Sequence, residues 1–220
     1  MGKLIVIEGL DGSGKATQAR LLAKAIRNRR SKVREVSFPD YDSPSSALVR
    51  MYLDGEFGDK PDDVNAFAAS TFYAVDRYAS FKKYWHDDYR DGVIIADRYT
   101  TSNAIHQCSK LHKTEWDGFL EWLFELEFCK LGIPIPDMVI YLRVDPEVSQ
   151  ILMSNRYYGH EEKKDIHEKD MAYLKRCQEA AEYCVDKLGW KTVDCCANGS
   201  MRNIEEIQAD IMWLVEAAGV

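Results

Sequence analysis

The chain has 220 residues, enough for one sizeable α/β domain or two small ones. Its 46% hydrophobic and 30% charged content is ordinary for a globular protein, and 36 acidic against 29 basic residues argue against binding to a nucleic acid polymer or an anionic membrane. No apolar run reaches the ~18 residues that span a bilayer, and six cysteines without a CxxC pair indicate reduced thiols in a cytoplasmic protein.

Five short segments have the pattern of strands. They are expected at residues 3–8, 32–37, 93–97, 138–144 and 190–194. The runs LIVI, VII and MVIYL are continuously apolar, as in parallel strands that are covered on both faces. Helical patterns lie between them, so right-handed βαβ crossovers are expected. The sequence therefore predicts an α/β fold, a five-stranded parallel sheet flanked by helices, and one domain over residues 1–220, since no Pro/Gly/Ser-rich linker divides it.

Two of the helical patterns are long enough to assign a core-facing stripe. Both show apolar residues at a spacing of about 3.6 residues, which is typical of an amphipathic helix. The first stripe is Val64, Phe67, Ala68, Thr71, Val75 and Tyr78, and the second is Met171, Leu174, Cys177, Ala181, Val185 and Leu188. We expect each stripe to face the core.

The first strand leads directly into GLDGSGKATQ. Gly9, Gly14 and Lys15 match the phosphate-binding pattern G-x-x-x-x-G-K, with a strand before it and a helical pattern after it. Glycines allow positive φ and bring backbone N–H groups close to phosphate oxygens at a helix N-terminus. Lysine at this position reaches the β- and γ-phosphates. An ATP site is therefore predicted at Gly9, Gly12, Ser13, Gly14, Lys15, Ala16 and Thr17.

Ala16 departs from that pattern. The position usually supplies a hydroxyl group to Mg²⁺, and alanine has none. Thr17, one residue later, is one substitute; phosphates, water and a carboxylate are another set of ligands for Mg²⁺. A degenerate loop in a noncatalytic nucleotide-binding protein is the alternative.

A second cluster is VIIADRYTTSNAIHQ. Asp97 and Arg98 end a predicted strand, and ligands of open α/β sheets bind at the carboxyl ends of strands. The carboxylate of Asp97 can hold Mg²⁺, directly or through water, and the guanidinium of Arg98 can bind a phosphoryl group. An ion pair that closes the strand end is the structural alternative.

Two further segments have a pattern of possible ligand contacts. Tyr73 and Arg77 are four residues apart and share a helix face offset from the apolar stripe, where they could stack on a base and bind its phosphate. Surface packing of Tyr73 over Arg77 is the alternative. The charged stretch SNRYYGHEEKKDIHEKD predicts a lid at roughly 154–168, with Arg156, Lys163 and Lys164 available to cover phosphates; a solvated loop is the alternative.

Taken in order, six stretches resemble the thymidylate kinases, a branch of the nucleoside monophosphate kinases. They are IEGLDGSGK, FPDY (38–41), FYAVDR (72–77), DRYTTSNA (97–104), YLRVDPE (141–147) and DIHEKD (165–170). The resemblance covers nearly the whole chain. It implies a three-layer P-loop NTPase fold with a small lid, a homodimer, and transfer of the γ-phosphoryl group of Mg-ATP to dTMP, giving dTDP and ADP. A kinase for another nucleotide or nucleoside is the alternative within the same class.

The resemblance also implies roles for single residues. Asp11 faces the sugar and phosphate of dTMP, Arg98 holds its phosphate, and Arg77 binds the carbonyl edge of the base, which revises the phosphate role given above. The other implied dTMP contacts are Phe38, Tyr41, Tyr73 as the stacking ring, and Asn103. Relatives often have phenylalanine where Tyr73 stands.

The same comparison assigns the catalytic groups. Lys15, Arg98 and Asp11 are implied on the loop side of the site. Some relatives carry an arginine inside the P-loop and others place cations in the lid; DGSG has none, so Arg156, with Lys163 or Lys164, is the expected clamp. Other relatives keep threonine only at the second position after the lysine, as Thr17 does here.

Overall fold

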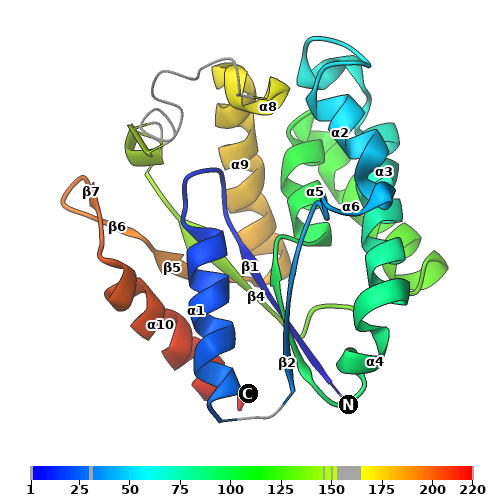
Figure 1. Cartoon of the computed structure of the whole chain (residues 1–220). Helices are drawn as coiled ribbons and strands as arrows, with labels where there is room; N and C mark the ends of the chain where they lie inside the picture. Colours follow the sequence, from blue (N-terminus) through cyan, green and yellow to red (C-terminus); the bar gives the residue numbers. More distant parts are fainter. Residues whose placement is uncertain (1, 30–31, 146, 150, 153–164, 220) are drawn as a thin grey trace.

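In the computed structural model, five parallel strands form a central sheet with helices on both faces (Figure 1). The structure describes residues 2–29, 32–145, 147–149, 151–152 and 165–219. The strands are β1 (Lys3–Glu8), β2 (Val33–Ser37), β3 (Val93–Asp97), β4 (Met138–Arg143) and β5 (Lys191–Asp194), in the order β2-β3-β1-β4-β5. The predicted α/β class and all five strands are confirmed, with bounds that differ by at most one residue. The single domain over 1–220 stays a prediction.

Nine α-helices lie wholly within the described residues. They are α1 (Lys15–Arg27), α2 (Ala47–Leu53), α3 (Ala66–Ser80), α4 (His86–Tyr89), α5 (Thr100–Cys108), α6 (Trp116–Phe124), α8 (Ile166–Lys169), α9 (Met171–Leu188) and α10 (Ile204–Ala217). A small antiparallel hairpin joins β6 (Cys196–Ala197) and β7 (Ser200–Met201). Within this part of the chain, no helix is both long and apolar enough to cross a bilayer.

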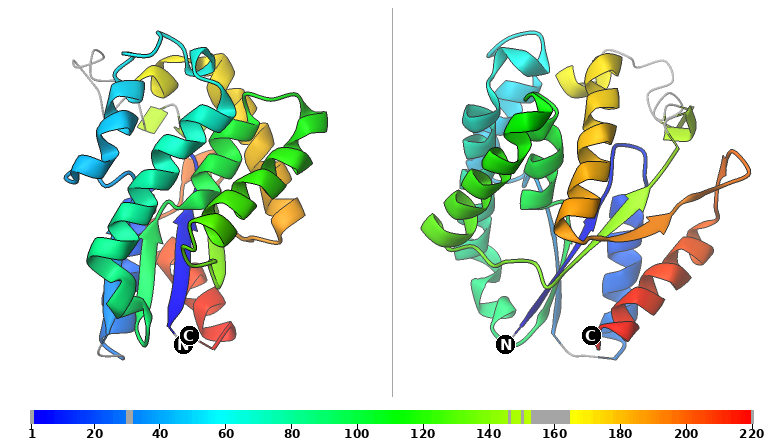
Figure 2. Two further views of the ribbon diagram at one scale, coloured as in Figure 1. Left: turned by 90° about the vertical axis from the view of Figure 1, so that its right-hand side faces the viewer. Right: turned by 180° about the vertical axis from the view of Figure 1, so that it is seen from behind.

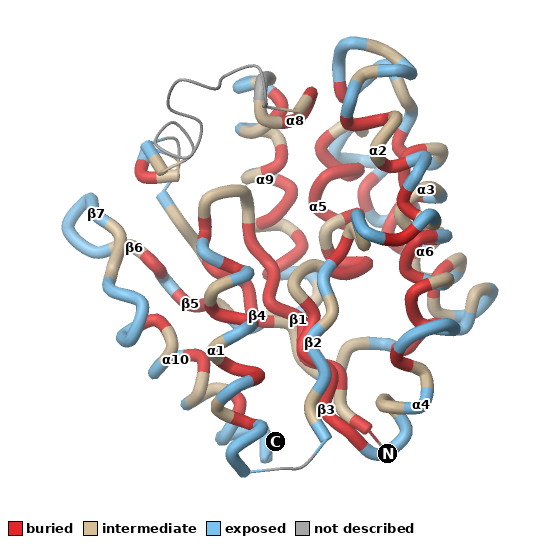
Figure 3. Tube along the Cα trace, in the orientation of Figure 1, coloured by how far each residue is buried: buried red, intermediate tan, exposed pale blue. Residues whose placement is uncertain are grey.

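The alternation of side chains along β1 divides the core into two layers. Ile5 and Ile7 pack with α1 and α10, whereas Leu4 and Val6 face the opposite side of the sheet. Helices α5 and α9 cover that second side together with the π-helical turn Phe81–Trp85 (Figure 2). Figure 3 shows the central strands buried along most of their length, which explains their continuously apolar sequences.

Helix α9 confirms its prediction, with bounds Met171–Leu188 and with Cys177, Ala181 and Val185 buried. Helix α3 shows that the other stripe was assigned to the wrong face. Phe67, Thr71, Val75 and Tyr78 are exposed, and the buried residues are Ala66, Ala69, Ser70, Ala74, Asp76, Arg77 and Ser80. Small residues allow α3 to pack closely on α5, and the buried charges find polar partners, so hydrophobicity alone indicates the wrong side.

Candidate functional site

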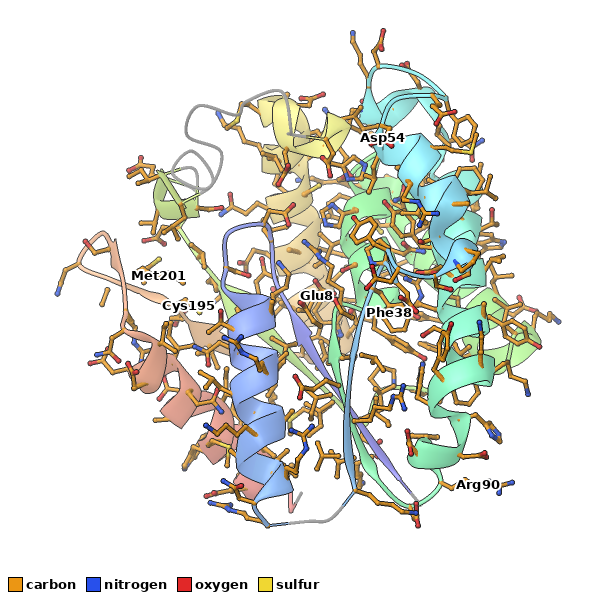
Figure 4. The ribbon with its side chains drawn as sticks, viewed as in Figure 1. Glu8, Phe38, Asp54, Arg90, Cys195 and Met201 are labelled. Atoms are coloured by element: carbon orange, nitrogen blue, oxygen red, sulfur yellow. The ribbon has the colours of Figure 1, made fainter. Side chains whose placement is uncertain are left out.

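A cavity of about 820 Å³ opens at the carboxyl ends of the strands, between the first loop, α3, α5 and α8. The carboxyl-end edge of the sheet carries Glu8 and Phe38, both labelled in Figure 4. The predicted site residues that line this cavity are Asp11, Gly12, Gly14, Lys15, Ala16, Thr17, Phe38, Tyr41, Tyr73, Arg77, Asp97, Arg98 and Asn103. Gly9 and Ser13 are buried beside it, and Arg156, Lys163 and Lys164 lie outside the described residues. Predicted groups from four separate stretches of the sequence therefore meet at one place.

The first loop has the backbone geometry of an anion-binding nest. Gly14 adopts φ +81° as the residue that precedes α1, and the first turn of α1 carries no acidic side chain. Gly9 has φ +156°, and a Cβ there would lie 2.6 Å from the Oγ of Ser13, so the tight turn requires glycine. The N–H groups at the start of α1 and the positive end of its dipole therefore remain available to an anion.

Lys15 extends across this loop. Its Nζ donates a hydrogen bond to the carbonyl oxygen of Leu10 at 2.9 Å and lies 4.0 Å from Oδ1 of Asp11. Burial, and then the nearby charge of Arg98, lowers the pKa of Lys15 from 10.5 to about 8. A bound phosphate would favour the charged form again, because an adjacent anion raises the pKa of an ammonium group.

Arg98 links the loop to the strand ends. Its guanidinium group forms an ion pair with Asp11 and lies 3.7 Å from Oε1 of Glu8, and it donates to the Oγ of Ser102 at 3.2 Å. Burial alone would raise the pKa of Asp11, but the charges of Arg98 and Lys15 hold it well below its usual range. Arg98 has φ +67°, a left-handed conformation that a non-glycine residue rarely adopts outside functional sites.

Glu8 is a site residue that the sequence analysis did not identify. Its side chain is fully buried and accepts hydrogen bonds from Thr101 Oγ1 at 2.6 Å, Ser102 Oγ at 2.8 Å and the backbone N–H of Gly9 at 2.9 Å. It thereby fixes the loop to the start of α5. The available signal was an acid at the end of an otherwise apolar strand, KLIVIE.

Asp97 lies at the end of β3 with its Oδ1 buried. No group in the described part of the chain hydrogen-bonds that oxygen. Burial raises the pKa of Asp97, although Lys15 and Arg98 oppose the shift. A buried carboxylate oxygen without a partner fits a position that faces a cation or its water shell.

The aromatic side of the cavity is formed by Phe38, Tyr41 and Tyr73. Phe38 is buried against Tyr99, with ring centroids 5.8 Å apart. Tyr73 is partly buried and packs edge-on against Tyr52, with centroids 6.5 Å apart. An aromatic face of this kind can stack on a planar base.

Arg77 is not a surface group, so the alternative of surface packing under Tyr73 is wrong. It is 1% exposed and forms a two-pronged ion pair with Glu127, from Nη2 to Oε1 at 2.6 Å and from Nε to Oε2 at 2.7 Å. Asn103 also has an internal partner, because its Nδ2 donates to the carbonyl oxygen of Ser70 at 3.1 Å. Both residues still line the cavity.

Gln107 was missed as a single residue, although its segment was identified. It is fully buried and lines the cavity, and both its Oε1 and its Nε2 lack a partner among the described residues. A buried amide left unpaired is costly, so its groups fit a ligand that supplies both a donor and an acceptor. The signal was its spacing: Gln107 lies one helical turn after Asn103.

Two histidines close the other end of the cavity. The rings of His106 and His167 stack with centroids 5.7 Å apart, and His167 Nε2 lies 2.8 Å from the Oη of Tyr52. Asp165 caps α8 by accepting hydrogen bonds from the N–H groups of His167 and Glu168, both at 2.9 Å. Burial raises the pKa of Asp165 to about 6. These contacts hold the described end of the predicted lid against α2.

The fold and the site define a nucleotide-binding protein of the P-loop class. An anion-binding loop follows the central strand, and a strand-end aspartate and an arginine lie beside an aromatic-lined part of the same cavity. Comparison with known proteins gives the family. The model of the family described as thymidylate kinase matches residues 7–211. The chain belongs to the thymidylate kinase family.

Relatives and solved structures agree with that assignment. A thymidylate kinase of Mycobacterium tuberculosis is 34% identical over 66% of this chain and 68% of its own length, and one of Schizosaccharomyces pombe is 29% identical over 100% and 94%. The structure of thymidylate kinase from Candida albicans matches with a TM-score of 0.70 at 20% identity, covering 99% of this chain and 92% of that one. The last comparison supports the predicted P-loop fold.

Proposed function

We propose that the protein transfers the γ-phosphoryl group of Mg-ATP to dTMP, giving dTDP and ADP. The observation that carries this proposal is that one cavity is lined by Lys15 on the phosphate loop, by Arg98, and by Tyr73, Arg77 and Gln107. Family membership supports the same reaction. Neither alternative, a kinase for another substrate or a noncatalytic nucleotide-binding protein, has an observation in its favour.

The chemistry requires alignment rather than a protein nucleophile. Phosphoryl transfer proceeds when donor and acceptor phosphates are held in line and water is excluded. The loop N–H groups of Gly12, Gly14, Ala16 and Thr17 would bind the donor phosphates. The N–H groups of Gly9 and Ser13 are held by Glu8 and by the carbonyl oxygen of Leu10, so these two residues would shape the turn around the donor. Lys15 would neutralise charge that develops between the β- and γ-phosphates, and Arg98, held by Asp11, would bind the acceptor phosphate.

With two phosphate-bearing ligands bound, the cavity would need additional cations to balance its negative charge. Among the described residues, its lining contains four basic side chains, Lys15, Arg50, Arg77 and Arg98, and five acidic ones, Asp11, Asp54, Asp97, Asp165 and Glu168. Two phosphate-bearing ligands would add further negative charge. Asp97, through water, and the hydroxyl of Thr17 would hold Mg²⁺, which when bound neutralises phosphate oxygens. Arg156 of the predicted lid would supply the remaining catalytic charge.

Recognition of the acceptor would combine stacking with hydrogen bonds. The ring of Tyr73 would stack on thymine, with Phe38 and Tyr41 enclosing the nucleotide. The guanidinium of Arg77 and the amides of Asn103 and Gln107 would bind the polar edge of the base. Gln107 supports this role most directly, because both ends of its buried amide are unpaired within the described structure.

We also propose a cytoplasmic homodimer. All six cysteines are free, which fits a reducing compartment. The outer face of α3 presents Phe67, Val75 and Tyr78 at 43%, 51% and 38% exposure, and Phe67 extends the apolar surface to Trp122 of α6, with ring centroids 4.7 Å apart. A second copy of the chain would bury this face.

A coupled assay of ADP release tests the reaction. We expect kcat/KM to be highest for dTMP and far lower for dGMP and AMP. It should be lower for dUMP than for dTMP, because a methyl group in an apolar pocket contributes ~1–3 kcal/mol to transition-state binding. A purine that outperforms dTMP would overturn the acceptor assignment. ATP binding without turnover of any of these nucleotides would support the noncatalytic alternative.

A further inference from the structure

Glu127 is a buried acid that the proposed reaction does not use directly. It lies in the π-helical turn Glu125–Lys130 that follows α6, and its side chain is completely inaccessible to solvent. Single π-helical turns inside helices often occur at functional sites. Burial of a carboxylate is unfavourable unless charged and polar groups compensate it, so the contacts of Glu127 indicate what it serves.

Three hydrogen bonds surround this carboxylate. Arg77 supplies two of them, from Nη2 at 2.6 Å and from Nε at 2.7 Å, and Thr100 Oγ1 donates the third to Oε2 at 2.8 Å. The Arg77 pair joins residues 50 positions apart in the sequence. The two-pronged geometry fixes the plane of the guanidinium group as well as its position.

The same contacts determine which part of Arg77 is free. A guanidinium group has five N–H donors. Glu127 accepts from two of them, and the carbonyl oxygen of Tyr99 accepts a third, from Nη1 at 3.3 Å. Within the described chain the remaining donors belong to Nη1 and Nη2, and Arg77 lines the cavity beside Tyr73 and Asn103.

We infer that Glu127 is a positioning residue for base recognition: its carboxylate holds Arg77 so that the remaining N–H groups face the polar edge of the acceptor base. This inference rests on the proposed function. Arginine can only donate hydrogen bonds, so a guanidinium fixed in this way favours a base with a carbonyl group at that edge and disfavours one with an amino group. Glu127 therefore contributes to the preference for dTMP and dUMP over dCMP.

The test compares Glu127→Gln with the wild-type enzyme. Glutamine has nearly the same shape, but it offers one acceptor atom in place of two and removes the charge. We expect KM for dTMP to rise about tenfold or more with a smaller change in kcat, and the ratio of kcat/KM for dTMP to that for dCMP to fall about tenfold. Binding of dTMP and dCMP measured by calorimetry should show the same loss of discrimination.

Glu125→Gln is the matched control. Glu125 lies in the same turn, but its ion pair with Lys130, at 3.0 Å, is exposed. This variant should keep the wild-type ratio of kcat/KM for dTMP to that for dCMP.

Thr100→Val is a second test variant. It removes one hydrogen bond to Glu127 and leaves both charges in place, so the dTMP:dCMP ratio should fall by a smaller factor than in Glu127→Gln. This variant replaces Glu127→Gln if the latter does not fold.

These measurements distinguish a failure of the proposed function from a failure of the role inferred for Glu127. Wild-type enzyme that does not prefer dTMP over dCMP would overturn the proposed acceptor before any variant is measured. A folded Glu127→Gln enzyme, or failing that Thr100→Val, with an unchanged dTMP:dCMP ratio would show that Glu127 is only structural and would overturn the inference alone.

Discussion

Replacing Lys15 should reduce catalysis without unfolding the protein. We expect Lys15→Ala to lower kcat by about 10²–10³-fold, which corresponds to about 2.7–4 kcal/mol, because the ammonium group acts mainly on charge that develops during transfer. Its loss should not unfold the protein, since burial already disfavours the charged form. Turnover in the ADP-release assay, together with a thermal melt, measures both effects.

Lys24→Ala is the control for that experiment, because Lys24 lies on the same helix and is exposed. It should leave turnover unchanged. Near-wild-type turnover in the folded Lys15→Ala enzyme would contradict the role of Lys15.

Gln107 should show a trade-off between stability and recognition. Replacing it with Met removes two buried polar atoms that lack partners and keeps a side chain of similar length. We expect the ligand-free protein to gain roughly 1 kcal/mol, because an unsatisfied buried group costs about 1–3 kcal/mol. KM for dTMP should rise at least about tenfold. Thermal melts with and without dTMP check this prediction, and a less stable variant with unchanged KM would contradict it.

The residues found from the sequence and those missed differ in a physical way. The residues around Gly14 and Lys15 were predictable because a phosphate-binding turn requires particular residue types at fixed spacing. Glu8, His106 and Glu127 act through burial and through partners far away in the chain, such as the Arg77–Glu127 pair, and Gln107 through a buried amide that no described residue pairs. Nothing in the local sequence indicates those partners.

At the level of the element, the sequence predicted helix α3 but not its orientation. The 3.6-residue period of Phe67, Val75 and Tyr78 is real, yet these side chains are exposed and Ala69, Ser70 and Arg77 face inward. Periodicity reports that a helix has two unlike faces. It does not report which face a neighbouring helix or a second copy of the chain covers.

Helices α5 and α8 meet through a histidine pair that should make stability depend on pH. Burial, and then the charge of Arg98, lowers the pKa of His106 from 6.5 to about 3, and burial, and then His106, lowers that of His167 well below 6.5. The unfolded chain then binds more protons than the folded one between these values. The free energy of unfolding should therefore fall as pH drops from 6.5 toward 3.

Urea unfolding at pH 7 and pH 5 measures this loss. His106→Asn should lose less stability than the wild type between pH 7 and pH 5, because only the pKa shift of His167 remains. Equal losses in the variant and the wild type would show that His106 does not carry the effect. The groups around His106 are Asp11, Lys15, Arg98, Lys110, His167, Tyr173 and Cys177.

Asp165 changes stability in the opposite direction. Its pKa is raised from 3.8 to about 6, so its contribution to the free energy of unfolding is largest below pH 3.8 and is lost as pH rises through 6.

For the whole molecule, the exposed face of α3 should determine the oligomeric state. Val75→Glu places a charge in the middle of the apolar surface formed by Phe67, Val75 and Tyr78. We expect it to convert a dimer to a monomer, as measured by sedimentation or light scattering. Glu56→Lys, at an exposed position outside that surface, is the control. A wild-type monomer would overturn the proposed dimer.

The order of the strands has a consequence for synthesis on the ribosome. β1 is translated first, but its two neighbours in the sheet begin at Val93 and Met138, and Gln18 of α1 donates to the carbonyl oxygen of Ile204 at 3.1 Å. A nascent chain shorter than about 138 residues therefore leaves one edge of an apolar strand unpaired, which is a site for aggregation. The phosphate loop is synthesised early, but the strands that pack beside it are synthesised late. Slow translation should therefore increase the need for a chaperone.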